Sequence, residues 1–111
     1  MIFITGSTGF LGKHLVKALL NENYKLRCLA RETSNTEHLK HPNIEIYYGD
    51  ITSYPSIKNS LTGVDTVIHL ATIYGISNKD LFYKVNVEGA KNIVKACKEN
   101  KVKRVIFHAF H

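Results

Sequence analysis

The sequence has only two cysteines in 111 residues, no run of five or more like charges and no long apolar segment. Cys28 and Cys97 stand far apart in apolar surroundings and lack neighbours at metal-ligand spacing, so we expect buried, reduced thiols and no disulfide. The apolar opening, residues 1–5, is too short for a signal peptide, and no stretch reaches the length of a membrane span. These absences predict a cytoplasmic protein without a membrane partner.

Basic residues outnumber acidic ones, with fifteen Lys and Arg against nine Asp and Glu and a formal net charge of +6. They are scattered along the chain, and no base-stacking or groove-reading motif accompanies them, so a solvated surface explains them better than a nucleic-acid interface. An anionic small ligand also fits this charge. The length predicts one domain over residues 1–111, and a composition that is 44% hydrophobic and 22% charged argues against disorder.

Apolar runs suited to buried strands alternate regularly with helix-like stretches. Strands are expected at residues 1–5, 25–30, 44–48, 66–71 and 104–107. Helices are expected at residues 10–21, 54–61 and 80–100, with a single helical turn before Pro42. This alternation, together with the absence of Asn-Gly or Asp-Gly hairpin turns, predicts an α/β fold with a doubly wound parallel sheet and helices on both faces.

Periodicity also predicts the buried side of the two longer helices. The first helix is expected to bury Leu11, Leu15, Ala18 and Leu19, with Lys13 and Lys17 pointing away. The second is expected to bury Val87, Ala90, Val94 and Cys97.

A glycine-rich loop, "ITGSTGFLGKHL", joins the first expected strand to the first helix. Gly6 permits the tight turn, Gly9 lets the backbone approach a pyrophosphate, and Gly12 lets the helix pack on the strand. The backbone N–H groups of Phe10 and Leu11 lie at the helix N-terminus, where the positive end of the helix dipole favours an anion. Because a strand precedes the motif and a helix follows it, the pattern favours a phosphate-binding loop over an ordinary turn.

The segment "TGSTGFLG", which contains Thr8, resembles the Thr-Gly-x-x-Gly-x-x-Gly loop of the extended short-chain dehydrogenase/reductase superfamily, which includes NAD-dependent epimerases, dehydratases and dihydroflavonol-reductase-like enzymes. Similar segments follow in family order: "YYGDI", "DTVIHLAT", "KVNVEGAKNIV" and "VKRVIF". The resemblance implies a Rossmann-type sheet of about five strands in the order 3-2-1-4-5, truncated after the fifth strand. It also implies a nicotinamide dinucleotide as cofactor.

The resemblance further implies roles for single residues. Asp50 would bind the adenine amino group, and Ile51 would pack on the adenine. Leu70 and Ala71 would line the path of the ribose and nicotinamide, and Asn86 would help to organise the active site. Taken without the family pattern, Asp50 could equally be a turn or N-cap residue.

The end of the second strand sets the choice between the two nicotinamide cofactors. An acidic residue there binds the 2′-hydroxyl of NAD, whereas an Arg accommodates the 2′-phosphate of NADP. Here Ala30 occupies the acidic position, Arg31 can form a fork with a phosphate, and Ser34 can donate one more hydrogen bond. The negative charge of Glu32 would repel the 2′-phosphate unless this side chain points outward. The sequence therefore favours NADP over NAD.

Catalysis in the resembled family uses a Ser, a Tyr and a Lys, the Lys lowering the Tyr pKa so that the phenol can act as general acid or base. The serine positions are taken here by His108, Ala109 and Phe110, so no catalytic residue is assigned and the chain alone is expected to be inactive. Tyr54 and Lys58 match Tyr-x-x-x-Lys, but at the wrong place in the family order, which indicates a chance match.

The histidines offer no complete metal site, because His38 and His41, like His108 and His111, lack further ligands at suitable spacing. We expect these side chains to be solvent-exposed. His69 resembles a structural position of the family more than a catalytic base.

The leading interpretation is the nucleotide-binding half of an NAD(P)-dependent oxidoreductase or epimerase whose substrate is a small carbonyl, hydroxyl or sugar-nucleotide compound. The alternative is a non-catalytic NADP-sensing or regulatory module. On the fifth strand, Val105 and Phe107 face one side and Ile106 the other, and no Pro blocks the edge. Self-association through this strand is therefore expected.

Overall fold

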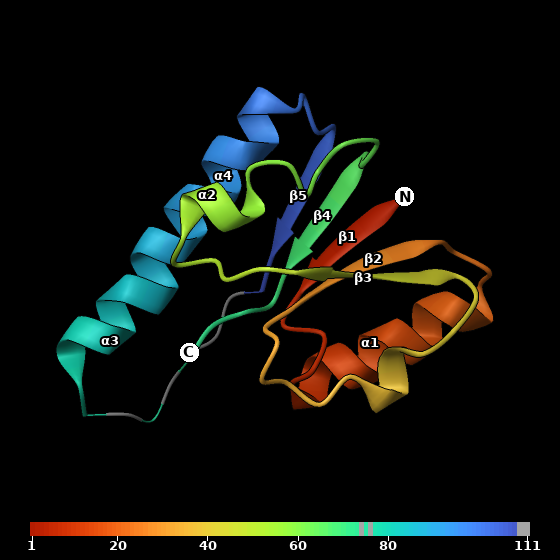
Figure 1. The fold of residues 1–111 in the computed structure, drawn as a ribbon, viewed down its shortest axis with the longest axis horizontal. Helices are drawn as coiled ribbons and strands as arrows, with labels where there is room; N and C mark the ends of the chain where they lie inside the picture. Colours follow the sequence, from red (N-terminus) through yellow and green to blue (C-terminus); the bar gives the residue numbers. More distant parts are fainter. Residues whose placement is uncertain (74, 76, 109–111) are drawn as a thin grey trace.

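The computed structural model describes residues 1–73, 75 and 77–108 and contains a parallel five-stranded sheet in the order β3-β2-β1-β4-β5 (Figure 1). The strands are β1 (Ile2–Thr5), β2 (Leu26–Ala30), β3 (Ile44–Tyr48), β4 (Thr66–His69) and β5 (Arg104–Phe107). All five lie where the apolar runs predicted them, although β4 ends two residues earlier than expected. The predicted strand order is confirmed.

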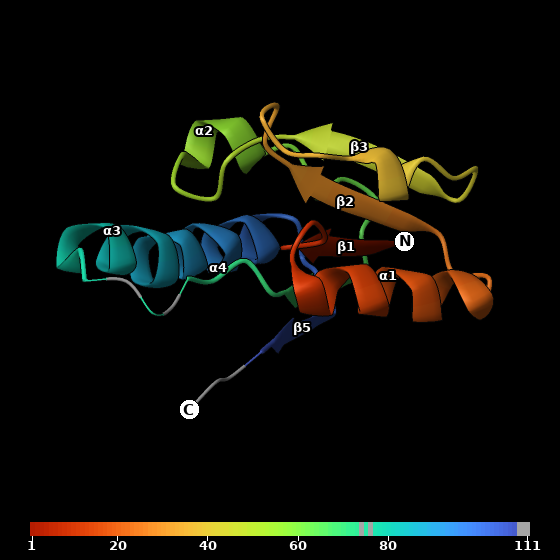
Figure 2. The same ribbon diagram turned by 90° about the horizontal axis from the view of Figure 1, so that it is seen from below.

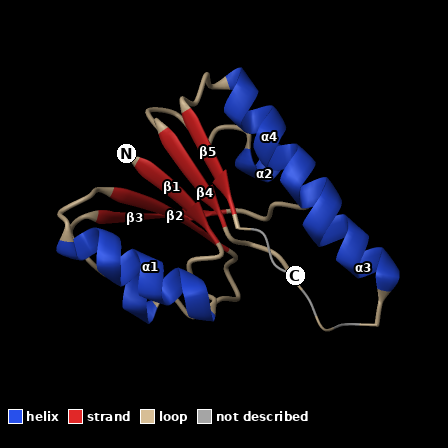
Figure 3. Ribbon diagram, turned by 180° about the vertical axis from the view of Figure 1, so that it is seen from behind, coloured by secondary structure: helices blue, strands red, loops and turns tan. Residues whose placement is uncertain are grey.

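Helical segments cover both faces of the sheet, as a doubly wound fold requires (Figures 2 and 3). One face carries α1 (Phe10–Asn21) and the single 3₁₀ turn η1 (Glu37–Leu39). The other face carries α2 (Tyr54–Ile57) and a continuous rod made of α3 (Lys79–Tyr83), the π-helical η2 (Lys84–Glu88) and α4 (Gly89–Glu99). The expected turn before Pro42 is confirmed, whereas α2 is shorter than predicted.

Successive side chains of β1 point to opposite faces of the sheet and belong to two separate hydrophobic cores. Phe3 is fully buried on the side of α2 and α4, where it belongs to one cluster with Val67 and Ile93. Its neighbour Ile4 is fully buried on the side of α1, in a cluster with Val16. Successive strand residues point to opposite faces, so one central strand anchors both layers. Burial of such a side chain contributes roughly 1.5–3 kcal/mol.

The predicted buried face of α1 is wrong in part. Leu11 is 46% exposed and Ala18 is exposed, whereas Gly12 and Val16 are buried. A Cβ atom on Gly12 would lie 2.0 Å from the carbonyl oxygen of Gly6, so the helix turns its glycine side toward the loop and sheet. The apolar stripe is therefore rotated from the one that periodicity indicated.

The long helical segment also departs from its prediction. Cys97 is buried as expected, but Val87, Ala90 and Val94 are only half-buried. The residues that α4 buries are Gly89, Ile93, Ala96 and Cys97. The π-helical η2, which precedes α4, has a wider turn than an α-helix, so a strict 3.6-residue pattern does not hold through it.

Cys28 and Cys97 are buried free thiols, which confirms their prediction, and burial raises the pKa of each to about 11. Within the part of the chain that the structure describes, no helix is both long and apolar enough to cross a membrane.

Candidate functional site

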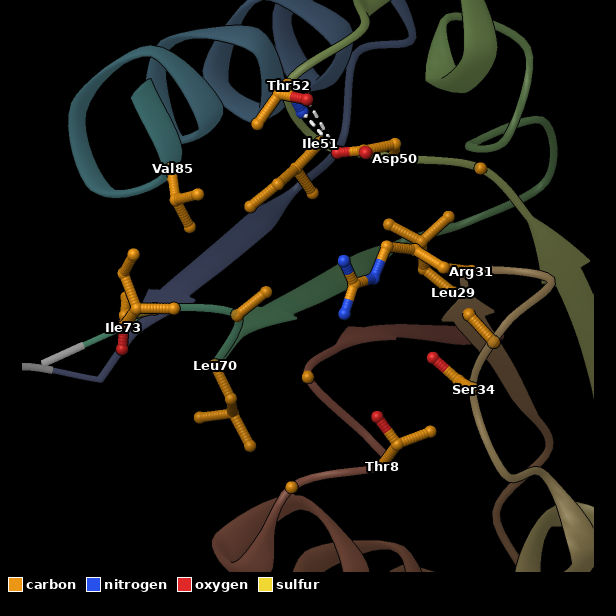
Figure 4. A pocket seen from close by; sticks show the side chains of 16 residues that line it. Thr8, Leu29, Arg31, Ser34, Asp50, Ile51, Thr52, Leu70, Ile73 and Val85 are labelled. Atoms are coloured by element: carbon orange, nitrogen blue, oxygen red, sulfur yellow. Dashed lines mark hydrogen bonds between the residues drawn. The ribbon is translucent and has the colours of Figure 1, made fainter. Parts of the chain in front are cut away.

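A cleft of about 280 Å³ opens where the strands end, at the point where the chain turns to opposite sides of β1 (Figure 4). Ligands of open α/β sheets bind in this crevice, outside the carboxyl ends of the strands. The lining residues come from the end of β2, from the loops after β1, β2, β3 and β4 and from η2: Gly6, Thr8, Gly9, Leu29, Ala30, Arg31, Ser34, Gly49, Asp50, Ile51, Thr52, Leu70, Ala71, Thr72, Ile73 and Val85.

The three glycines of the β1–α1 loop are required for different reasons. Gly6 has φ +76°, and a Cβ atom there would lie 2.7 Å from the carbonyl carbon of Leu70. At Gly12 the carbonyl oxygen of Gly6 occupies the space that a side chain would need. For Gly9 the nearest described atom is the same oxygen at 3.5 Å, which is ordinary contact, and its φ of −79° suits any residue. The fold thus requires Gly6 and Gly12, whereas the packing around Gly9 does not.

Gly9 is also the N-cap of α1 and supplies no side-chain cap. Its N–H donates to the carbonyl oxygen of Gly6 (3.1 Å), and its own carbonyl oxygen accepts from Lys13 (3.0 Å). The N–H groups of the first helical residues, Phe10 and Leu11, have no intrahelical acceptor. Their side chains, like Gly12, do not line the cleft, and Phe10 is 83% exposed. What this end of the helix offers is backbone N–H groups and the positive end of the dipole.

The loop after β2 contributes a cation and a hydroxyl group. The guanidinium of Arg31 reaches into the middle of the cleft, and the hydroxyl groups of Thr8 and Ser34 point into it from the side of the glycine loop (Figure 4). The N–H of Ser34 donates to the carbonyl oxygen of Arg31 (2.9 Å), which keeps both residues at the same rim. A guanidinium flanked by hydroxyl groups suits a phosphate.

Asp50 lies across the cleft at the end of β3. Its Oδ1 accepts from the N–H (2.9 Å) and the hydroxyl (2.8 Å) of Thr52. Burial raises the pKa of this carboxyl, but the Thr52 bonds and the charges of Arg31 and Lys84 outweigh it, so the pKa lies below its usual value. Among the described residues no partner is present for Oδ2, which leaves a charged acceptor at the cleft.

The loop after β4 is held from two sides. The hydroxyl oxygen of Thr5 accepts from the N–H groups of Leu70 and Ala71, each at 3.1 Å. Asn86 forms a pair of bonds with Ile73: its Oδ1 accepts from the N–H (2.8 Å) and its Nδ2 donates to the carbonyl oxygen (2.7 Å). Asn86 does not line the cleft, so it acts by fixing Ile73. The π-helical turn places it beside Val85, which does line the cleft.

His69 stands directly behind this loop. It is 2% exposed, and its Nδ1 lies 2.7 Å from the hydroxyl oxygen of Thr5. Because that oxygen already accepts two N–H groups, its proton is directed to Nδ1, which makes the imidazole an acceptor there and leaves its own proton on Nε2. Burial lowers the pKa of His69 to about 4. A neutral side chain that accepts from the Thr5 hydroxyl, which in turn holds the N–H groups of Leu70 and Ala71, is structural, as the resemblance implied.

Sequence reasoning did not single out six lining residues: Leu29, Gly49, Thr52, Thr72, Ile73 and Val85. All but Val85 lie at the end of a strand or within four residues after it, so the rule that strand ends line the crevice could have found them. It also missed two supports on α4. The Nδ2 of Asn92 donates to the carbonyl oxygen of Ile51 (2.7 Å), and a Cβ atom on Gly89 would lie 2.8 Å from the Cδ1 of Ile51.

The Tyr-x-x-x-Lys match does not contribute to the cleft. Tyr54 packs under the ammonium group of Lys95, 4.1 Å from its ring centroid, and neither Tyr54 nor Lys58 is a lining residue. Of the positions expected for the serine, the N–H of His108 donates to the carbonyl oxygen of His69 (3.2 Å), whereas Ala109 and Phe110 lie outside the described residues. In the described ranges, no three His, Cys, Asp or Glu side chains gather as a metal site.

Comparison with known proteins places this geometry in a family. The model of the NAD dependent epimerase/dehydratase family matches residues 2–109. Human sterol-4-alpha-carboxylate 3-dehydrogenase, decarboxylating, is 36% identical over 104 residues, which are 93% of this chain and 27% of the human protein. The chain thus spans about a quarter of the length of this curated relative.

Solved protein structures are similar to this chain over most of its length. WbmH of Bordetella bronchiseptica, crystallised with NAD⁺, is 32% identical with a TM-score of 0.77, covering 94% of this chain and 36% of WbmH. DesIV of Streptomyces venezuelae, a dTDP-glucose 4,6-dehydratase crystallised with NAD, is 26% identical with a TM-score of 0.83, covering 94% of this chain and 37% of DesIV. The chain belongs to the NAD-dependent epimerase/dehydratase family and has its Rossmann fold.

Proposed function

We propose that the cleft binds a nicotinamide dinucleotide and that the chain is the dinucleotide-binding portion of an NAD(P)-dependent oxidoreductase or epimerase. Gly9 carries the proposal. It lines the cleft, its backbone conformation suits any residue, and the packing around it leaves room for a Cβ atom. A ligand that needs close approach to the backbone explains a glycine at such a position.

The residues of the cleft fit such a ligand. The pyrophosphate would lie against Gly9 and the N-terminus of α1, where free N–H groups favour an anion. The adenine would pack on Ile51 with its amino group toward the free oxygen of Asp50, and the ribose and nicotinamide would follow Leu70 and Ala71. The cofactor, when bound, would accept or deliver a hydride. The chain's own residues would bind it and orient it.

The cofactor preferred in this proposal is NADP. Ala30, where an acidic residue would bind the 2′-hydroxyl of NAD, has no hydrogen-bonding side chain. Arg31 and Ser34 stand at the same rim and can donate to a 2′-phosphate. Glu32, the possible obstacle, is exposed and does not line the cleft.

Calorimetric titration with NADPH tests the binding site through Gly9→Val. The valine side chain would occupy the space of the pyrophosphate while the fold tolerates it, so we expect binding to be lost with an unchanged circular dichroism spectrum. Ala18→Val, at an exposed position of the same helix, is the matched control and should bind like the parent chain. Retained NADPH binding by a folded Gly9→Val chain would refute the phosphate-binding loop.

Cofactor preference is tested by comparing NADPH and NADH in an Arg31→Ala chain. Loss of a charge-assisted contact of 1.5–3 kcal/mol predicts NADPH binding weaker by roughly ten- to a hundredfold, with little change for NADH. Arg104→Ala, which removes the same charge from an exposed position outside the cleft, should leave both affinities unchanged. An unchanged preference in Arg31→Ala would leave the cofactor site standing but refute NADP selection by this residue.

Activity is proposed only for the longer protein that the relatives represent. There the substrate would be a small carbonyl, hydroxyl or sugar-nucleotide compound that exchanges a hydride with the cofactor. A non-catalytic NADP-sensing module would use the same cleft. An assay of hydride transfer at saturating cofactor separates the two.

A further inference from the structure

A second hollow lies between α1 and the segment that contains η1, separate from the dinucleotide cleft. It has a volume of about 350 Å³ and is lined by Lys13, Val16, Lys17, Leu20, Asn21, His38 and His41. None of these residues lines the first cleft. The lining residues of the second hollow come from α1 and from the segment that contains η1. We name it the α1–η1 groove.

The composition of this groove points to an anion. Two lysines on α1 and two histidines on the facing segment line it, with no acidic lining residue among the part of the chain described. Lys13 and Lys17 are exposed and four residues apart, so they lie on one side of the helix, where like charges repel each other. Neither ammonium group has a hydrogen bond or ion pair to the described residues. A bound anion would offset this repulsion.

Each of the two histidines is oriented by one hydrogen bond to the backbone. The Nε2 of His38 donates to the carbonyl oxygen of Ser7 (2.9 Å), since a carbonyl can only accept. The Nδ1 of His41 accepts from the N–H of Asn43 (3.0 Å), which leaves the proton of a neutral ring on Nε2. His38 is half-buried, so the prediction that it is exposed is wrong, whereas His41 is exposed as predicted. His41 therefore presents an N–H donor beside the two ammonium groups.

We propose that the α1–η1 groove binds a small phosphate-bearing anion, separate from the dinucleotide. Lys13 and Lys17 supply the charge, His41 donates through Nε2, and the amide of Asn21 lies at the far end of the groove. The α-helix rises 1.5 Å per residue, so the lining residues from Lys13 to Asn21 extend over about 12 Å. That length exceeds one phosphate and suits a short chain of phosphates. His38 connects the groove to Ser7, which lies inside the glycine loop.

The experiment follows the ¹H–¹⁵N spectra of the whole chain during titration with inorganic phosphate and with tripolyphosphate at constant ionic strength. Both probes should shift the signals of Lys13, Lys17 and the rings of His38 and His41 in a saturable way, and tripolyphosphate should bind more tightly. The Lys13→Gln/Lys17→Gln chain should bind at least about tenfold more weakly, because it loses both ammonium contacts. Since both side chains are exposed, this variant keeps the fold, which its spectrum verifies.

The matched control is Lys91→Gln/Lys98→Gln, which removes the same charge from exposed positions on α4. It should retain the affinity of the parent chain. Equal weakening in both double variants would overturn the proposal in favour of nonspecific charge attraction, and so would shifts that do not saturate.

Shifts confined to residues 6–12 would likewise overturn the proposal, because they would place the probe on the dinucleotide loop. Gly9→Val separates the two sites. Groove binding should survive in that chain, whereas the proposed function predicts that it no longer binds NADPH, so either proposal can fail alone.

Discussion

The buried pair formed by Thr5 and His69 should make the stability of this chain depend on pH in a defined interval. The pKa of His69 is lowered to about 4 by burial, from an ordinary value of 6.5 in the unfolded chain. Between these values, the unfolded chain binds a proton that the folded chain does not. The free energy of unfolding therefore falls as the pH falls from about 6.5 to about 4, and this residue makes no pH-dependent contribution above that interval.

Each pH unit in the interval removes about 1.4 kcal/mol, so the whole interval removes about 3 kcal/mol. That is a large part of the 5–15 kcal/mol typical of a small domain. The geometry gives the reason for the cost: a proton on Nδ1 would face the hydroxyl oxygen of Thr5, which already accepts the N–H groups of Leu70 and Ala71. Protonation therefore removes an acceptor that the folded chain uses.

Urea unfolding at pH 7 and at pH 5 measures the effect before the carboxylates titrate. We expect the free energy of unfolding to drop by about 2 kcal/mol between the two pH values. His69→Gln should reduce this difference, since the variant cannot bind the proton, whereas His14→Gln, at an exposed position, should keep it. The same pH dependence in the parent chain and in His69→Gln would refute the reasoning.

Three further predictions concern the supports of the fold and its edge. Arg27→Met should lower the free energy of unfolding in urea by about 1–3 kcal/mol. The guanidinium donates to the backbone carbonyl oxygens of Ser60 (2.6 Å) and Thr62 (2.8 Å), which would lose this donor. An unchanged free energy of unfolding would contradict the prediction. Asn86→Ala should weaken NADPH binding, measured by calorimetry, by roughly tenfold without unfolding the chain, because Ile73 loses two hydrogen bonds. Full NADPH affinity in this variant would argue against a positioning role for Asn86. The residues Val105–Phe107 are 36–50% exposed on the edge strand β5. Light scattering should therefore show concentration-dependent self-association of the chain, which Ile106→Lys should reduce. A monomer at all concentrations would contradict this prediction.

The sheet could be predicted from the sequence because each strand is a short, largely apolar run, and the central strands β1, β2 and β4 are mostly buried. Such runs, with helices between them, leave little choice of fold class, and the family resemblance supplied the order of the strands. The edge strands at residues 44–48 and 104–107 were also bounded correctly, although they are partly exposed, because polar and turn residues flank each run. The cleft followed from the fold, because strand ends in a doubly wound sheet meet at one edge.

Side-chain placement on the helices was harder to predict, because it depends on contacts far away in the sequence. Leu11 appears apolar and periodic, yet Gly12 must face the carbonyl of Gly6, and this contact rotates α1. The π-helical turn at η2 leaves no composition signal either, although it brings Asn86 to Ile73. Arg27 lies within an apparently buried strand and is accommodated by Glu45 and by carbonyls of the loop at residues 60–62.

The glycine loop is fixed by the fold before any ligand arrives. Gly6 is packed against the backbone of Leu70, and the carbonyl oxygen of Ser7 accepts from His38. The hydroxyl of Ser7, which is fully buried, donates to the carbonyl oxygen of Leu29 (3.4 Å). A loop held at consecutive residues loses little freedom on binding, so more of the contact energy would appear as affinity. It follows that a substitution at Ser7, which is buried and does not line the cleft, should weaken binding by loosening the loop, whereas Gly9→Val should block binding in a loop that keeps its shape.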